Sequence, residues 1–167
     1  HDSSDYGVLN TPETIPYIFK TLKNFSNSSN VHIGPISIGM HFNPYGESLV
    51  ENKNKIRLEM ADSDPRHDQL FSLTWTLAIF IQSINKESKF FTFNSIYGHH
   101  GILNKDNTKR PLYHLNNFLI SLSNSEIFKF NPINEVYGLK IVLNDKKYYL
   151  FVNSSKQKKE INISELN

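Results

Sequence analysis

Apolar residues recur at the spacing of an α-helix in three segments of the chain. These segments begin at Thr11-Pro12, Asp64-Pro65 and Arg110-Pro111, where each proline fits the first position of a helix. Thr11 and Asp64 are predicted to be the N-caps before two of these prolines. The second helix is apolar around much of its circumference, over residues 70–84, so we expect it to be covered on several sides with Trp75 in the core. The other two carry apolar stripes, at Ile15, Ile18, Phe19, Leu22 and Phe25 and at Leu112, Leu115, Phe118, Leu119 and Leu122.

Short strand-like runs separate these helices. Residues 31–38 form one run, which Gly34-Pro35 interrupts, and residues 90–96 form the other, in which side chains alternate in character. Strands that alternate with helices in this way predict parallel β/α units. Two strands cannot make a stable parallel sheet by themselves, so we expect further strands to precede His1.

The pattern changes after residue 124, where no further helix is indicated. Strand-like runs cover residues 126–130, 136–143, 148–152 and 160–163. Asn144-Asp145 supplies the turn of a hairpin between the second and third runs. We therefore predict an α/β chain: residues 1–124 form the C-terminal portion of a (β/α)8 TIM-type barrel, and residues 125–167 form a small antiparallel β-domain.

Composition narrows the function classes. The formal net charge is +2, but residues 104–167 hold 10 of the 18 Lys and Arg residues and only 6 of the 16 Asp and Glu residues. This basic region lacks the interleaved aromatic residues that are typical of a nucleic-acid-binding site. No apolar run in the sequence approaches the ~20 residues needed to cross a bilayer. There is no cysteine, which excludes disulfides and thiol chemistry. We expect a cytoplasmic protein that binds neither nucleic acid nor membrane.

Reacting groups in β/α barrels stand at the C-terminal ends of the strands and in the loops that follow. That rule selects residues 1–5, 37–46 and 94–101. These stretches hold two candidate catalytic residues, His1 and Asp5, and seven candidate substrate-binding residues: Ser37, His41, Asn43, Tyr45, Tyr97, His99 and His100.

Each candidate has a simpler structural explanation. Asp5 can cap the turn into the first helix. His99 and His100 are adjacent, so on extended backbone they point to opposite sides. A metal site from His1, His41 and one of that pair is conceivable, but metal-ligand spacing is lacking, and we expect neither metal nor cofactor. An N-terminal histidine can chelate copper, as in oxidative polysaccharide-cleaving enzymes. Those enzymes are β-sandwiches, however, and the helices predicted here argue against such a site. Packing or solvation explains the remaining histidines, among them His67.

At these same positions the chain resembles the D-apionate lactonase family. The similarity runs from His1 to about Leu122 and is carried by residues 1–8, 33–46, 64–77 and 110–114. Its most specific part is the run Gly-Pro-Ile-Ser-Ile-Gly-Met-His-Phe-Asn-Pro-Tyr-Gly, at residues 34–46. The resemblance implies a glycosidase-like β/α barrel with β-domains that hydrolyses a branched-sugar lactone. It would place residues 34–38 on the seventh barrel strand and residues 91–95 on the eighth.

The resemblance has departures. The family often carries an arginine where His41 stands and a second acidic residue where Ser4 stands, so the binding of an anionic group is expected to differ here.

We predict a lactone hydrolase of carbohydrate catabolism whose activity this chain alone does not supply, with a small sugar lactone as its partner. Two alternatives remain open, a glycoside hydrolase of a related barrel type and a non-catalytic carbohydrate-binding barrel. The seventh strand ends without Asp or Glu, which disfavours the glycosidase.

Overall fold

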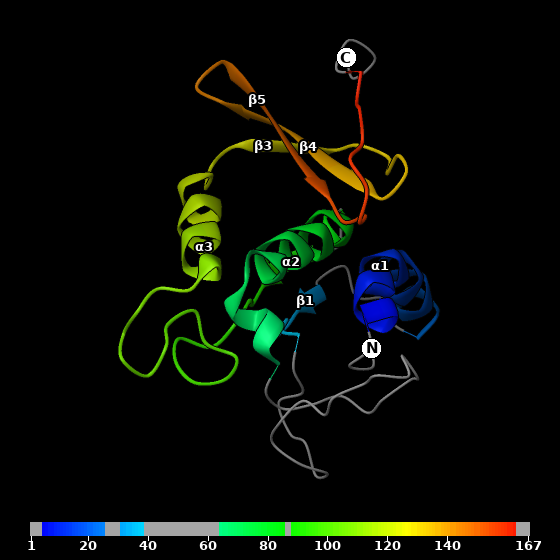
Figure 1. Ribbon diagram of the computed structural model, residues 1–167. Helices are drawn as coiled ribbons and strands as arrows, with labels where there is room; N and C mark the ends of the chain where they lie inside the picture. The colour runs from blue at the N-terminus through cyan, green and yellow to red at the C-terminus, as the bar shows by residue number, and fades with distance from the viewer. Residues whose placement is uncertain (1–4, 26–30, 39–63, 86–87, 163–167) are drawn as a thin grey trace.

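The computed structural model describes residues 5–25, 31–38, 64–85 and 88–162 (Figure 1). Its elements in chain order are α1 (Asp5–Phe25), β1 (Val31–Ile33), the 3-10 helix η1 (Pro65–Asp68), α2 (Leu70–Ser83), β2 (Ser88–Phe91), α3 (Pro111–Ser121), β3 (Glu126–Lys129), β4 (Val136–Leu143) and β5 (Lys146–Asn153). The predicted alternation of helix and strand, followed by an all-strand region, is confirmed. Among the described helices, none is both long and apolar enough to cross a membrane.

The two strands between the helices pair in parallel, as predicted, with His32 opposite Phe90 and Ile33 opposite Phe91. Both are shorter than the sequence indicates. The regular ladder ends at Gly34, which has φ +137°, and a Cβ there would lie 2.3 Å from the carbonyl oxygen of Thr92. The chains still stay together beyond this point, because the Ile36 amide donates to the Thr92 carbonyl at 3.2 Å. Glycine is needed here because the neighbouring backbone comes too close for a side chain.

The last three strands form an antiparallel sheet in the order β3-β4-β5. Asn144 and Asp145 join β4 to β5 with φ values of 49° and 61°, so the predicted hairpin turn is confirmed. Both positive angles match the two-residue turn that the twist of a hairpin favours. The expected fourth strand is wrong over residues 160–162, which have no strand structure, and Ile163 lies outside the described residues.

Helix α2 lies in the middle of the described structure, with α1 and α3 on either side and the antiparallel sheet across it (Figure 1). Its near-continuous apolar surface supplies two cores. One core joins α2 to α3 and the sheet through Leu77, Ala78, Phe80, Ile81, Leu112, Leu115, Leu122, Tyr137, Leu139, Ile141 and Val152. The other joins α2 to α1 and the strand segment after β1 through Val8, Ile36, Ile38, Trp75 and Ile79. The expected cover on several sides and the core position of Trp75 are confirmed.

Helix α1 begins at Asp5, seven residues before the predicted first residue Pro12, and contains Pro12 and Pro16 in its interior. A proline has no N–H to donate to the carbonyl four residues earlier, which for Pro12 is the carbonyl of Val8. In this structure that buried carbonyl accepts a 2.8 Å hydrogen bond from the indole N–H of Trp75. A side chain from α2 therefore replaces the missing backbone donor. Thr11 is not a cap, because its hydroxyl donates back to the Gly7 carbonyl at 2.9 Å.

The buried faces of the outer helices differ from the predicted stripes. Within the α1 stripe, Phe19 is buried, whereas Phe25 is 85% exposed. On α3, Leu112 and Leu115 are buried as predicted, but Phe118 is 42% exposed. The earlier start adds Val8 to the buried face of α1, which runs through Val8, Pro12 and Phe19, whereas Ile18, Leu22 and Phe25 of the predicted stripe are exposed.

Truncation of the sheet's central core residue should cost much of the stability. Leu139 is fully buried on β4 between the sheet and α2. We expect Leu139→Ala to lower the free energy of unfolding by about 2–5 kcal/mol, measured by urea denaturation, because it leaves a cavity. Phe128→Ala is the matched control, since Phe128 lies on the same sheet but is 50% exposed. An equal loss of unfolding free energy in both variants would contradict the central place of Leu139 in the core that the sheet shares with α2.

The link between Pro12 and Trp75 can be tested with a double-mutant cycle. Trp75→Phe leaves the buried Val8 carbonyl without its donor, which costs about 1–3 kcal/mol beyond the loss of packing. Pro12→Ala restores a backbone N–H that can serve the same carbonyl. We therefore expect Trp75→Phe to be about 1 kcal/mol less destabilising when it is combined with Pro12→Ala than when it is made alone. Additive effects in thermal or urea unfolding would show that the indole bond does not compensate for the proline.

Candidate functional site

The segments that follow β1 and β2 meet at one end of the structure, where η1 and the long connection to α3 also lie (Figure 1). This is the end at which parallel β/α units carry their functional groups. The two segments are joined directly, because the Asn94 side-chain amide donates to the Ile36 carbonyl at 3.1 Å. We refer to this end, with residues 34–38, η1 and residues 92–110, as the rim.

Arg66 of η1 ties the start of α1 to the rim. Its guanidinium binds the carboxylate of Asp64, the N-cap of η1, and also donates to Asp5 Oδ1 at 2.9 Å. Asp64 accepts the Arg66 backbone N–H as well, at 2.9 Å, so the predicted capping role of Asp64 is confirmed. Burial opposes the charge of Arg66, but the hydrogen bond and charge of Asp64, with help from Asp5, raise its pKa above the ordinary value.

The next two residues of η1 bind the connection between β2 and α3. The His67 imidazole is 2% exposed, and its Nε2 lies 3.0 Å from the carbonyl oxygen of Gly101. Because a carbonyl only accepts, Nε2 carries the proton. Burial is the main cause that lowers the pKa of His67, so the ring is held neutral. Asp68 forms an ion pair with Arg110, which stands just before α3.

The structure places the predicted site residues in two groups. Asp5 lies in the first turn of α1 rather than in a loop, so that expectation is wrong, and its side chain is 67% exposed. Tyr97 and His99 are exposed and His100 is half-buried, all on the loop after β2, while Ser37 is half-buried beyond β1. Helix η1 links the two groups, since Arg66 binds Asp5 and His67 binds the loop. The remaining candidates lie outside the described residues: His1, His41, Asn43 and Tyr45.

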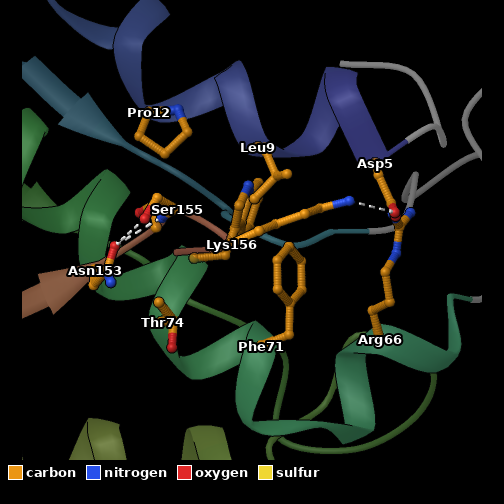
Figure 2. A pocket seen from close by; sticks show the side chains of 11 residues that line it. Asp5, Leu9, Pro12, Arg66, Phe71, Thr74, Asn153, Ser155 and Lys156 are labelled. Carbon is orange, nitrogen blue, oxygen red and sulfur yellow. Dashed lines mark hydrogen bonds and ion pairs between the residues drawn. The ribbon is translucent and has the colours of Figure 1, made fainter. Parts of the chain in front are cut away.

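A pocket of about 380 Å³ lies next to Asp5, between α1, α2 and the segment that follows β5 (Figure 2). That volume falls in the range of small-molecule sites. Its walls are mostly apolar, with polar groups at the two ends. The lining residues are Asp5, Leu9, Pro12, Arg66, Phe71, Thr74, Trp75, Asn153, Ser154, Ser155 and Lys156.

Lys156 reaches across this pocket toward the start of α1 (Figure 2). Its Nζ lies 3.5 Å from Asp5 Oδ2, and both side chains are largely exposed. The Asp5 carboxylate therefore stands between two cations, Arg66 and Lys156. Its position in the first turn of a helix is also favoured by the helix dipole.

The chemistry of the described rim is that of hydrogen bonding and proton transfer. Its side chains include two carboxylates, three imidazoles, a phenol and two guanidinium groups, which can bind a polyhydroxylated ligand and a developing negative charge. Within the described ranges, no group of three or more His, Asp or Glu side chains is arranged to hold a metal ion. Because His1 and His41 lie outside those ranges, the expectation that no metal is needed stays a prediction.

Sequence reasoning missed the residues that hold the rim together. The sequence pattern marks Arg66 and Arg110 only as neighbours of helix-starting prolines, and it explains His67 by packing. One sequence signal could have found them. The run Asp64-Pro65-Arg66-His67-Asp68 places four polar, ionisable residues around a helix-starting proline, which indicates a site of ion pairs and hydrogen bonds. Their partners, Asp5, Gly101 and Arg110, are 34 to 61 residues away in the chain, and spacing alone does not reveal such contacts.

Comparisons with known proteins identify the family of this chain. The family model for the TIM barrel domain of D-apionate lactonase matches residues 1–124. The D-apionate lactonase of Brucella anthropi is 32% identical over 119 residues, which cover 68% of this chain and 20% of that enzyme. The chain thus spans about a fifth of the length of this relative. No solved structure matches the chain. The predicted resemblance is confirmed, and the chain belongs to the D-apionate lactonase TIM barrel domain family.

Proposed function

We propose that this chain is part of a hydrolase that opens a sugar-acid lactone, in the manner of D-apionate lactonase. The observation that carries the proposal is the family match over residues 1–124, which include α1, the parallel pair and the whole rim. The loops at such a rim determine the substrate in β/α barrels.

In this proposal residues 1–124 are the C-terminal portion of a (β/α)8 barrel. The segment that begins with β1 is the seventh strand, the segment that begins with β2 is the eighth, and α3 is the last helix. The parallel pairing of β1 with β2 supports this order, as does the helix that follows each strand. Residues 125–167 form the separate antiparallel β-domain, represented by the β3-β4-β5 sheet, which packs on α2.

Lactone opening needs a base and groups that stabilise negative charge. The base removes a proton from water as the water oxygen bonds to the lactone carbonyl carbon, and donors bind the oxyanion of the tetrahedral intermediate. The intermediate collapses when the ring C–O bond breaks, and the departing alkoxide takes a proton. The products are one carboxylate and one new hydroxyl, so the reaction consumes only water and releases a proton at neutral pH.

Asp5 and His1 are the proposed bases. Arg66 and Lys156 fix the Asp5 carboxylate at the start of α1, so its position is defined by contacts on two sides. His41, Asn43 and Tyr45 are proposed to bind the oxyanion and sugar hydroxyls, together with Ser37 and the loop residues Tyr97, His99 and His100. The exposed side chains of Tyr97 and His99 support that role, because they are available to a ligand.

The proposed activity is tested by turnover of sugar-acid lactones, followed as acid release at constant pH, in the natural protein that contains this sequence. Hydrolysis of D-apionolactone or a related branched-sugar lactone is the expected result. Binding of such a lactone without acid release would favour the non-catalytic barrel. Release of sugar from a glycoside, with no action on lactones, would favour the glycosidase.

Asp5→Asn separates a catalytic role from a structural one. If Asp5 is the base, or orients His1 as the base, turnover should fall by ~10²–10⁴-fold while the protein stays folded, because the amide has the same shape but cannot accept a proton. The measurement is kcat for lactone hydrolysis together with the midpoint of thermal unfolding. Near-normal turnover with a lowered midpoint would show that Asp5 only anchors η1.

Lys156→Met is the matched control for that variant. It removes one ion pair of Asp5 but leaves the carboxylate and most of the lysine's apolar stem in place. An exposed pair of this kind contributes about 0–1 kcal/mol, so both turnover and stability should change little. A loss of turnover equal to that of Asp5→Asn would assign the effect to the ion pair rather than to the base.

Removal of metal ions should leave the activity intact. A general base and hydrogen-bond donors are sufficient for lactone opening, and the histidines of the sequence lack metal-ligand spacing. We expect unchanged kcat after dialysis against a chelator. Activity that is lost on chelation and restored by one divalent ion would instead make His1, His41 and one of His99 or His100 the ligand set to mutate first.

A further inference from the structure

Two largely buried side chains, His67 and Arg110, bind the same backbone carbonyl in the connection between β2 and α3. The carbonyl oxygen of Gly101 accepts a hydrogen bond from His67 Nε2 at 3.0 Å and another from Arg110 Nη1 at 2.7 Å. Arg110 Nη1 also donates to the Gly98 carbonyl at 2.7 Å, and Asp68 pairs with the same guanidinium. The Arg110 side chain is only 10% exposed. Two separate elements, η1 and the start of α3, thus fix the same point of the loop.

The backbone around that point is closed on itself. The Ser95 amide donates to the His100 carbonyl at 3.0 Å, and the Ile102 amide donates to the Ser95 carbonyl at 2.9 Å. The Gly101 amide in turn donates to the Gly98 carbonyl at 3.0 Å. At Gly101 a Cβ would lie 2.5 Å from the backbone carbon of Tyr97, so the turn is too tight for a side chain there. The whole loop 95–102 should therefore move with the Gly101 carbonyl.

The side chains that this loop carries do not explain why it is held so firmly. Tyr97 is 56% exposed and His99 is exposed, so they add little packing. The groups that hold the backbone are largely buried, by contrast, and ordering buried polar groups has a cost in desolvation. Firm support beneath exposed polar and aromatic side chains is the arrangement expected of a loop that must present them to a ligand.

We propose that His67 and Arg110 are positioning residues of the lactone site, which hold the loop 95–102 so that Tyr97, His99 and His100 meet the substrate. This inference rests on the proposed function, because it needs the loop to contact the lactone. His67 suits the task because burial keeps the ring neutral, with one proton directed at the carbonyl. Arg110 suits it because its guanidinium binds two loop carbonyls and Asp68 at once.

The test combines loop exchange with kinetics in the natural protein. His67→Leu removes the donor, and Arg110→Lys keeps the charge but loses the planar fork. We expect faster hydrogen exchange at the amides of Ser95, Gly101 and Ile102 in both variants, and kcat/KM for the lactone lower by ~10²-fold, since small displacements of binding groups have effects of that size. His67→Gln retains an N–H donor and should recover part of both quantities.

Leu139→Ala is the matched control, because it destabilises the core, against which Ile102 of the loop packs, but removes none of the hydrogen bonds from His67 and Arg110 that hold the loop. It should lower the unfolding midpoint without a selective increase in loop exchange and with near-normal kcat/KM. Unchanged loop exchange in His67→Leu and Arg110→Lys would overturn the proposal. Faster exchange with unchanged kcat/KM would overturn it too, because the support would then be structural only. If the unmodified protein opens no lactone, both the proposed function and the role of the two residues in a lactone site are overturned. The exchange data then still show whether His67 and Arg110 hold the loop.

Discussion

The apolar circumference of α2 is the constraint on which the rest of the described structure depends. A helix of this kind is stable only when every side is covered, and here α1, the parallel strands, α3 and the antiparallel sheet each cover one side. Its N-terminal extension, η1, is thereby fixed at the rim. The same packing that stabilises α2 therefore sets the positions of Arg66, His67 and Asp68, from which the candidate site is organised.

The elements with strong local signals could be predicted from the sequence. Three such signals are confirmed: the continuous apolar run of α2, the proline that begins α3 and the Asn144-Asp145 turn. Each depends only on neighbours within a few residues. The start of α1 could not be predicted in this way. Proline normally ends or begins a helix, and only a contact with Trp75, 67 residues from Val8, satisfies the carbonyl that Pro12 leaves without a donor.

The candidate site was predictable in outline and not in its connections. The rule that barrel chemistry lies after the strands selected Asp5 and the loop with Tyr97, His99 and His100, and the structure places both beside η1. The partners of those segments were not visible, because an arginine bound to a distant carboxylate or carbonyl has the same local sequence as one in solvent. His67 is an example, because its burial does not distinguish a histidine that only fills the core from one that binds and supports a loop.

The indole bond that bridges Val8 and Trp75 also has a consequence for the order in which the chain folds. Before α2 is in place, the N-terminal segment has two prolines and an unsatisfied carbonyl in its middle, so as an isolated peptide it should break near Pro12. Continuity of α1 then arises on docking rather than by nucleation within the segment. During synthesis, the 67 residues that follow Val8, up to and including Trp75, must leave the ribosome before α1 can become continuous.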